Sequence, residues 1–213
     1  MGDNVAESVR LLLVTEDRLV AGRDLVALAR AAERGGVTAV QLRLKQASVR
    51  DQVLAARALI AALRVPVLVN DRPDVALAAG AAGVHLGPED LPVELVRRIA
   101  PAGFVIGASV GSEAEAAAAA GADYWGIGPW RATTTKGDAG EPLGAEGFAR
   151  LVRLAGRRPC IAIGSVRPED VPLVHAAGGA GVAVAAGILG EDDVEGAARR
   201  YRAAAAGPGT VSP

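Results

Sequence analysis

The feature that most constrains this fold is an eightfold alternation of two residue patterns along the chain. Short runs of β-branched and other apolar residues, typical of buried strands, alternate with Ala-, Leu- and Arg-rich runs of helical period. Near-continuous apolar strands separated by helices indicate a parallel sheet covered by helices. Eight such units favour a closed (β/α)8 barrel, the TIM-barrel fold, in a single domain. A doubly wound open sheet is the alternative, and 213 residues leave room for only short connections.

The patterns give approximate bounds for each element. The predicted strands cover residues 11–15, 39–44, 66–70, 83–87, 104–110, 124–129, 160–164 and 181–186. The predicted helices cover 23–34, 49–63, 73–79, 92–99, 113–120, 145–155, 168–177 and 191–205. Ser48 and Ser112 are expected to cap two of them. Residues of about 1–9 and 206–213 are expected to form short flexible tails.

Composition narrows the class of partner. The net charge is -1 and aromatic residues make up 3% of the chain, so neither a basic surface nor base-stacking platforms are expected. The N-terminus lacks a secretory signal pattern, and the uncharged stretch 171–190 contains Pro172 and several glycines, which favour a helix, a turn and a strand over a membrane span. We therefore expect a cytoplasmic protein with small-molecule substrates and no nucleic-acid or membrane partner. The oligomeric state stays open, and the single Cys160 is expected to be a buried, inert thiol.

In barrels of this type the functional site lies at the C-terminal ends of the strands. Polar residues of this chain collect at those ends, whereas the opposite ends carry no comparable cluster. The polar residues are Arg43 and Lys45 after the second strand, Asn70 and Asp71 after the third, Asp90 after the fourth, Ser109 in the fifth, and Thr133, Thr134, Thr135 and Lys136 after the sixth. The seventh strand ends in Gly164 and Ser165, and the eighth in Ala185, Ala186 and Gly187.

The segment after the sixth strand combines three threonines with a lysine. Of the 23 Lys and Arg residues only two are lysines, Lys45 and Lys136, and each follows a predicted strand. Three hydroxyls beside one ammonium suit an anionic, oxygen-rich ligand, because hydroxyls donate hydrogen bonds and the ammonium neutralises charge. A solvated turn is the alternative for this segment.

Two carboxylates follow adjacent strands, and Asp71 and Asp90 together suit one Mg²⁺. Asp90 fits a helix N-cap equally well, and Asp71 fits a capping turn. Arg43 and Lys45 have the spacing that places two side chains on one face of a strand. The ends of the last two strands match the usual phosphate position in barrels, so the residues indicate metal-assisted handling of a diphosphate and a second phosphate site.

The chain has two histidines. His85 lies in the middle of a predicted strand and is expected to point into the barrel, where a hydrogen-bonded core histidine and a ligand contact are both open. His175 lies in a predicted helix, so a structural role is expected for it.

Taken together, these motifs resemble the thiamine-phosphate synthase family from the first strand to the eighth. The matching segments are QLRLK (41–45), LVNDRPDVALAAGAAGVHLGPEDLP (68–92), IGAS (106–109), DYWGIGPWRATTTKGDA (123–139), AIGS (162–165) and GVAVAAGI (181–188). The resemblance implies a transferase that joins an aminopyrimidine methyl diphosphate to a thiazole phosphate and releases diphosphate by a dissociative, Mg²⁺-assisted route.

The same resemblance implies a role for each matching residue. The residues that would bind the pyrimidine diphosphate are Gln41, Arg43, Lys45, Asn70, Ser109 and Lys136, of which Lys136, Arg43, Lys45 and Ser109 would serve catalysis. Asp71 and Asp90 would hold Mg²⁺. The residues that would bind the thiazole phosphate are Thr133, Thr134, Thr135, Ser165, Ala185 and Ala186. The long segment 131–144 is expected to close over the site.

Four positions depart from the family pattern. Leu44 replaces an acidic residue and Pro88 a glutamine, whereas Ser165 replaces a glycine and Ala186 a serine. The last two fall where the thiazole phosphate is expected, so they bear on its affinity. A thiazole tautomerase with the same barrel, a non-catalytic binding paralogue and a generic phosphate-binding isomerase are the alternatives. The combined cation and carboxylate set counts against the first two, and the isomerase leaves the TTTK and ND/ED pairings unexplained.

Overall fold

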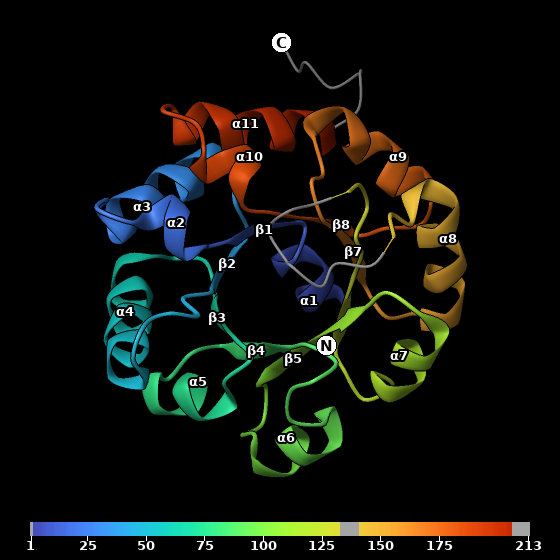
Figure 1. Ribbon diagram of the computed structural model, residues 1–213, viewed down its shortest axis with the longest axis horizontal. Helices are drawn as coiled ribbons and strands as arrows, with labels where there is room; N and C mark the ends of the chain where they lie inside the picture. Colours follow the sequence, from blue (N-terminus) through green and yellow to red (C-terminus); the bar gives the residue numbers. More distant parts are fainter. Residues whose placement is uncertain (1, 133–140, 206–213) are drawn as a thin grey trace.

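The computed structural model describes residues 2–132 and 141–205 of the chain, and its architecture is a closed barrel of eight parallel strands. The strands pair in chain order, and β1 also pairs with β8, which closes the sheet. Figure 1, which looks down the barrel, shows the helices as a ring outside the strands. The predicted TIM barrel is therefore confirmed, and the open-sheet alternative is excluded.

The elements follow the predicted order. The strands are β1 (Leu11–Val14), β2 (Ala39–Leu42), β3 (Val67–Asn70), β4 (Gly83–Leu86), β5 (Val105–Val110), β6 (Tyr124–Ile127), β7 (Cys160–Ile163) and β8 (Gly181–Val184). The helices are α1 (Gly2–Ser8), α2 (Asp17–Val20), α3 (Leu25–Gly35), α4 (Val49–Ala62), α5 (Pro73–Ala79), α6 (Val93–Ile99), α7 (Glu113–Ala118), α8 (Gly144–Ala155), the 3-10 helix η1 (Pro168–Asp170), α9 (Val171–Ala176), α10 (Ala186–Leu189) and α11 (Val194–Ala205).

Capping explains several helix bounds. The side chains of Ser48 and Ser112 accept hydrogen bonds from backbone N–H groups in the first turns of α4 and α7, as predicted. Helix α3 ends where Gly36 adopts a φ of 107°, a left-handed conformation that glycine takes at little cost. Several predicted strands were one or two residues too long, because the chain leaves the sheet there to form the loops above the barrel.

The N-terminal segment corrects one prediction. Residues of about 1–9 were expected to be a flexible tail, but Gly2–Ser8 form α1, and Val9 is buried. Val5 packs against the apolar residues inside the barrel, and Figure 1 shows α1 across the barrel's central axis. The helix therefore covers the N-terminal end of the barrel, where inward-facing side chains would otherwise meet water.

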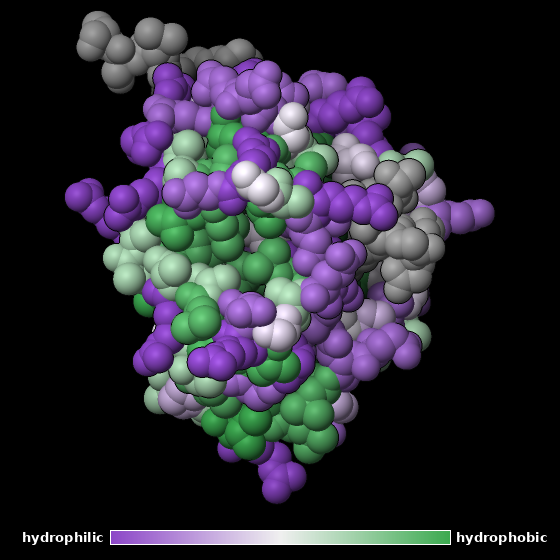
Figure 2. Space-filling model, turned by 60° about the vertical axis from the view of Figure 1, so that its left-hand side comes forward, coloured by the Kyte–Doolittle hydropathy of each residue, from purple (hydrophilic) through white to green (hydrophobic). Residues whose placement is uncertain are grey.

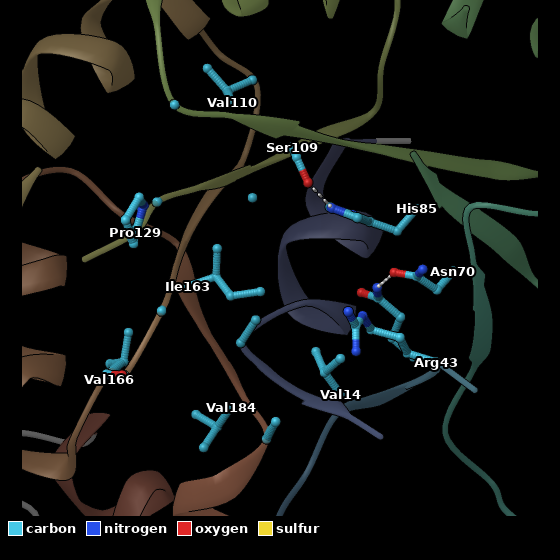
Figure 3. Close-up of a pocket in the computed structure, with 18 of the residues that line it drawn as sticks. Val14, Arg43, Asn70, His85, Ser109, Val110, Pro129, Ile163, Val166 and Val184 are labelled. Atoms are coloured by element: carbon cyan, nitrogen blue, oxygen red, sulfur yellow. Dashed lines mark hydrogen bonds between the residues drawn. The ribbon is translucent and has the colours of Figure 1, made fainter. Parts of the chain in front are cut away.

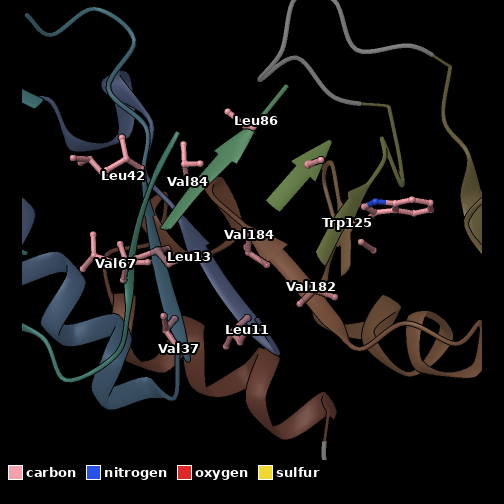
Figure 4. Close-up of a cluster of buried hydrophobic side chains, with 14 of the residues drawn as sticks. Leu11, Leu13, Val37, Leu42, Val67, Val84, Leu86, Trp125, Val182 and Val184 are labelled. Carbon is pink, nitrogen blue, oxygen red and sulfur yellow. The ribbon is translucent and has the colours of Figure 1, made fainter. Parts of the chain in front are cut away.

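Alternation along each strand divides the core into two parts. The larger part fills the space between strands and helices, and Leu13, Leu42 and Val84 belong to it (Figure 4). The smaller part lies inside the barrel and includes Leu12 and Ile161. Because the inner part is small and apolar, polar side chains that point inward nearer the C-terminal ends of the strands can line a cavity.

The outer surface is largely polar, although several large apolar side chains are exposed on it. Figure 2 shows apolar residues reaching the surface at the lower end of the molecule, where α6 lies, and Leu91, Leu95 and Ile99 are exposed there. Among the residues that the structure describes, no helix combines the length and the apolar character needed to cross a membrane.

Candidate active site

A cavity of about 550 Å³ opens at the C-terminal ends of the strands (Figure 3). Seven of the residues predicted to bind substrate line it: Gln41, Arg43, Asn70, Ser109, Ser165, Ala185 and Ala186. They come from β2, β3, β5, the loops after β2, β7 and β8, and the start of α10, so residues far apart in the chain meet there. The strand-end rule thus predicted that these residues, distant in sequence, lie together.

The backbone of Arg43 is hydrogen-bonded to the residue that follows β1, the strand next to β2. The Thr15 side chain, at the end of β1 and fully buried, accepts a hydrogen bond from the Arg43 N–H at 2.7 Å and donates one to the Arg43 carbonyl at 3.2 Å. This bridge fixes the backbone at the point where β2 ends. Arg43 therefore leaves the sheet in a defined position beside the cavity.

The predicted common strand face for Arg43 and Lys45 is wrong. Strand β2 ends at Leu42, and Lys45 lies in a turn whose N–H donates to the carboxylate of Asp17 at 3.0 Å. Lys45 does not line the cavity but extends across to the next strand end, where its ammonium nitrogen lies 3.0 Å from an Asp71 oxygen. The two cations thus face different parts of the site.

Two amides meet on the inner wall. Gln41 is buried, and its side-chain nitrogen donates to the Asn70 side-chain oxygen at 2.7 Å. That bond occupies one donor of Gln41 and one lone pair of the Asn70 oxygen. The Gln41 oxygen and the Asn70 amide nitrogen keep hydrogen-bonding capacity toward a ligand.

Asp71 and Asp90 form a carboxylate pair near Lys45. Asp71 has a φ of 62°, a left-handed conformation that aspartate tolerates better than most residues, and its N–H donates to the His85 carbonyl at 2.8 Å. The Asp90 carboxylate accepts the Gly87 N–H at 2.6 Å and shares a hydrogen bond with Asp71. The pKa of the Asp90 carboxyl is raised to about 6, mainly because the group is buried and to a lesser extent because of this hydrogen bond.

The alternative role of Asp90 as a helix cap is excluded. Pro92 occupies the N-cap position of α6, and no side chain makes a capping hydrogen bond there. The Asp90 carboxylate instead faces Asp71, as a shared ligand site requires. The described residues hold no group of three or more His, Cys, Asp or Glu side chains arranged around a metal position. Any cation here would take two carboxylate ligands from the described part of the protein and complete its shell elsewhere.

His85 points into the barrel, as expected. It is buried, with Nδ1 2.8 Å from the Tyr124 hydroxyl and Nε2 3.0 Å from the Ser109 hydroxyl oxygen. Figure 3 shows His85 and Ser109 facing each other at the cavity wall. His85 is therefore the hydrogen-bonded core residue that was one of the two possibilities, and it also forms part of the cavity wall. A contact with a ligand stays a prediction.

Two other expectations for single residues are confirmed. Cys160 is buried, and burial raises the pKa of its thiol to about 12, which keeps it protonated and unreactive. His175, near the end of α9, has a structural role, because its Nδ1 lies 3.0 Å from the Gly179 carbonyl oxygen.

The opposite wall is built mainly from backbone and apolar side chains. Gly164 and Ser165 follow β7 with φ angles of 100° and 51°, so both adopt left-handed conformations. A side chain at Gly164 would come within 2.8 Å of Pro129, which explains the glycine. After β8, Ala185 and Ala186 lead into the short helix α10. Ser165 is the one polar side chain among the described lining residues of this wall.

The segment after β6 is tied to this wall at its start. The Arg131 guanidinium forms a two-point ion pair with Asp170, which is 1% exposed, and the Arg131 N–H donates to the Gly164 carbonyl at 3.0 Å. Burial acts to raise the pKa of Asp170, but the hydrogen bonds from Arg131 and the Arg167 N–H outweigh it, and the net pKa is lowered. Thr133, Thr134, Thr135 and Lys136 lie outside the described residues.

Sequence reasoning missed several residues of the site. Thr15 was placed inside the first strand, although a polar residue ending an apolar run is the same signal that found Asn70. The sequence does not predict a role for Tyr124 in the site, because aromatic residues are common in buried strands. Glu16 and Glu115 also line the cavity, but their carboxylates accept backbone N–H groups of α2 and of Gly111.

Comparison with known proteins agrees with this geometry. The model of a protein family described as thiamine monophosphate synthase matches residues 11–188, from the first strand into the helix after the eighth. The chain belongs to the thiamine monophosphate synthase family. The relation expected from the motifs is therefore confirmed, as is the enzyme class, a transferase of thiamine biosynthesis.

Individual relatives of the thiamine monophosphate synthase family match nearly end to end. A thiamine-phosphate synthase of Methanoculleus marisnigri is 48% identical over 197 residues, which cover 90% of this chain and 93% of that protein. One of Moorella thermoacetica is 42% identical with the same coverage. The solved structure of a thiamine phosphate pyrophosphorylase from Pyrococcus furiosus superposes with a TM-score of 0.85 at 36% identity, covering 95% of this chain and 98% of that one.

Proposed function

We propose that the protein condenses 4-amino-2-methyl-5-(diphosphomethyl)pyrimidine, the pyrimidine diphosphate below, with 4-methyl-5-(2-phosphoethyl)thiazole, the thiazole phosphate. The bond between the pyrimidine methylene carbon and the diphosphate oxygen breaks, and its electron pair leaves with diphosphate. The thiazole nitrogen then forms a bond to the methylene carbon of the resulting cation. Thiamine phosphate and diphosphate are the products.

The observation that carries this proposal is that hydrogen-bond donors line the cavity while a lysine and two carboxylates lie at the adjacent strand ends. Arg43, Asn70 and Ser109 supply hydrogen-bond donors to the cavity, and Lys45 lies beside Asp71 and Asp90. Bond breaking by this route requires neutralisation of the charge that grows on the diphosphate more than it requires a general base. A cationic and donor-rich wall meets that requirement.

The side-chain amides of Gln41 and Asn70 would orient the pyrimidine diphosphate in the cavity. Because Gln41 donates to Asn70, the Gln41 oxygen is available to accept a hydrogen bond from the pyrimidine amino group, and the Asn70 nitrogen is available to donate to the diphosphate. The two residues would thus form hydrogen bonds to opposite ends of one substrate. We assign both to binding of the pyrimidine diphosphate.

The carboxylate pair fits a magnesium ion. Asp71 and Asp90 lie close enough for their carboxyl groups to interact, and both supply only oxygen ligands. Mg²⁺ prefers oxygen and commonly takes one or two protein carboxylates, completing its shell with water and substrate phosphate oxygens. When bound, Mg²⁺ would add positive charge beside the departing diphosphate. Asp71 and Asp90 are the residues that would hold it.

The thiazole phosphate is assigned to the opposite wall. Gly164, Ser165, Ala185 and Ala186 line the cavity after β7 and β8, the usual place for a phosphate in this fold. The roles of Thr133, Thr134 and Thr135 toward the thiazole phosphate, and of Lys136 toward the diphosphate, rest on the motif alone and stay predictions. A cytoplasmic location also stays a prediction.

The first experiment is an assay of the purified protein with both substrates and Mg²⁺, with and without EDTA. Thiamine phosphate would be detected as its oxidised fluorescent derivative. We expect product that EDTA abolishes and that excess Mg²⁺ restores. Arg43→Ala protein, purified in parallel, controls for a contaminating synthase.

Two outcomes would contradict the proposal. Absence of product from folded protein that still binds the thiazole phosphate would favour a tautomerase-like or non-catalytic paralogue. Equal product from wild-type and Arg43→Ala protein would show that the activity comes from elsewhere. Product that survives EDTA would retain the synthase and remove Mg²⁺ from the proposal.

A further inference from the structure

A row of three residues crosses the barrel strands beneath the cavity. In the strand register His85 of β4 pairs with Gly107 of β5, and Gly107 pairs with Tyr124 of β6. A side chain at Gly107 would come within 2.2 Å of the Tyr124 ring, so the tyrosine crosses β5 only because glycine stands there. A side chain at Gly126 would likewise approach the His85 ring to 3.0 Å. Two glycines therefore make room for a Tyr124–His85 contact.

The Tyr124 hydroxyl has a proton that needs an acceptor. Tyr124 is completely buried, and burial raises the pKa of its hydroxyl, so the phenol is neutral and keeps that proton. Within residues 2–132 and 141–205, the hydrogen bond found for this hydroxyl is the one to His85 Nδ1, at 2.8 Å. Buried hydroxyl groups are rarely left without a partner. Nδ1 therefore accepts, and the proton of the neutral imidazole lies on Nε2.

The position of that proton decides what Ser109 can do. With its proton on Nε2, His85 donates to the Ser109 hydroxyl oxygen, 3.0 Å away. The serine must then direct its own proton toward another acceptor, and Ser109 lines the cavity. With the opposite tautomer, Ser109 would donate to His85 and present only lone pairs to the cavity. Lone pairs would repel an anionic oxygen, whereas a proton would bind it.

We propose that Tyr124 is a positioning residue that fixes the Nε2–H tautomer of His85, so that Ser109 donates its hydroxyl proton to the bound substrate. The tautomer itself follows from the protein geometry. The identity of the acceptor, an oxygen or ring nitrogen of the pyrimidine diphosphate, rests on the proposed function. Tyr124 acts through His85 and Ser109 and does not line the cavity.

The tautomer can be read directly by NMR spectroscopy of isotope-labelled histidine, because the chain has only two histidines. His175 Nδ1 faces the Gly179 carbonyl, which can only accept, so His175 is expected to be protonated on Nδ1. Above the pH range in which histidine titrates, we expect one ring of each tautomer. A His175→Asn variant assigns the signals. Wild-type His85 protonated on Nδ1 would overturn the proposal.

The Tyr124→Phe variant tests the cause. It keeps the ring and removes the hydroxyl, so the His85 signal should change toward a mixture of tautomers while that of His175 stays the same. The kcat/KM for the pyrimidine diphosphate should fall by about three- to tenfold, the effect of one hydrogen bond. An unchanged His85 spectrum in Tyr124→Phe would remove Tyr124 as the cause.

A double-mutant cycle separates positioning from packing. On a Ser109→Ala background, Tyr124→Phe should change kcat/KM by less than about twofold, because the serine that transmits its effect is absent. An equal loss on both backgrounds would mean that Tyr124 only supports the fold.

Thr38→Val is the matched control. It removes another hydroxyl, which is bonded to Leu11 at the N-terminal end of the barrel, and should lower stability without changing kcat/KM. If wild-type protein forms no thiamine phosphate, the proposed function fails, whereas the NMR result still decides the tautomer.

Discussion

The two walls of the cavity are built in different ways. At the ends of β2 to β5, side chains contact one another: Gln41 with Asn70, Lys45 with Asp71, and His85 with Ser109. At the ends of β7 and β8, the wall is made of Gly164, Ser165, Ala185, Ala186 and neighbouring apolar residues. We therefore expect the first wall, the side-chain wall, to depend on residue identity. The second, the backbone wall, should depend on backbone conformation.

This difference bears on the departures from the family pattern. The positions with Ser165 and Ala186 both fall in the backbone wall, whereas Arg43, Asn70 and Ser109 in the side-chain wall match the motif. A backbone donor keeps its chemistry when the side chain changes, provided that the new residue can adopt the required φ and ψ. These two departures are therefore compatible with an intact phosphate site.

The largest effect is expected for Arg43→Ala. Arg43 brings a fixed positive charge to the cavity, so its loss should lower kcat/KM for the pyrimidine diphosphate by roughly 100-fold or more. Steady-state kinetics would measure the effect, and Arg43→Lys should recover only part of it, because lysine lacks the two-point donor geometry. Arg57→Ala, on the exposed side of α4, is the matched control and should leave kcat/KM unchanged. A loss below about threefold in Arg43→Ala would break the contrast between the walls.

The next effect concerns the metal. Asp71→Asn keeps the size of the side chain but removes its charge, so the Mg²⁺ concentration for half-maximal activity should rise about tenfold or more. Asp74→Asn is the control, because this carboxylate lies three residues further along the chain and pairs with Arg72. An Mg²⁺ titration of both variants checks the result. Superimposable curves for wild type and Asp71→Asn would take Asp71 out of the metal site.

A smaller effect is expected for Thr15→Val, which nearly preserves shape. The variant leaves the buried Arg43 N–H without its 2.7 Å partner, which should cost about 1–3 kcal/mol of unfolding free energy. It should also lower kcat/KM by about tenfold or less, because Arg43 loses the contact that fixes its backbone. Thr15→Ser retains the hydroxyl and should restore both properties. Chemical denaturation and kinetics together test this, and a stability loss without any kinetic change would make Thr15 purely structural.

The side-chain wall was also the part that the sequence predicted best. Asn70 and Ser109 follow apolar strand patterns, and the C-terminal ends of parallel strands meet at one edge of the barrel, so local patterns were sufficient. Lys45 was misplaced because the sequence pattern does not show that β2 ends at Leu42. The side chain nevertheless reaches the site, since it is long enough to extend to Asp71.

Other features depend on relations between strands and cannot be read from one segment. Tyr124 contacts His85 only because the register places Gly107 between them. Helix α1 has little apolar pattern of its own and is positioned by the open end of the barrel, which Val5 helps to cover. In both cases the determining information lies in the pairing of distant residues, which local periodicity does not contain.

Within the backbone wall, Ala186→Ser should have a modest effect. Ala186 begins α10 at the cavity, and a serine there adds a hydroxyl donor beside the expected phosphate. The KM for the thiazole phosphate should fall by about two- to threefold, the lower range for one added hydrogen bond. The KM for the pyrimidine diphosphate should not change, and it serves as the internal control. A fall in both would mean that Ala186 does not separate the two substrates.

The smallest effect is expected for Ser165→Gly, because two contributions oppose each other. Serine at a φ of 51° carries a left-handed strain of about 1 kcal/mol that glycine would relieve. Glycine also gives the unfolded chain more conformational freedom, which costs roughly 0.5–1 kcal/mol on folding. The net change in unfolding free energy should stay below about 1 kcal/mol, and the KM for the thiazole phosphate should stay within about twofold. A KM that falls tenfold would show that the Ser165 side chain obstructs the phosphate. The site would then be limited by a side chain even where it is built from backbone.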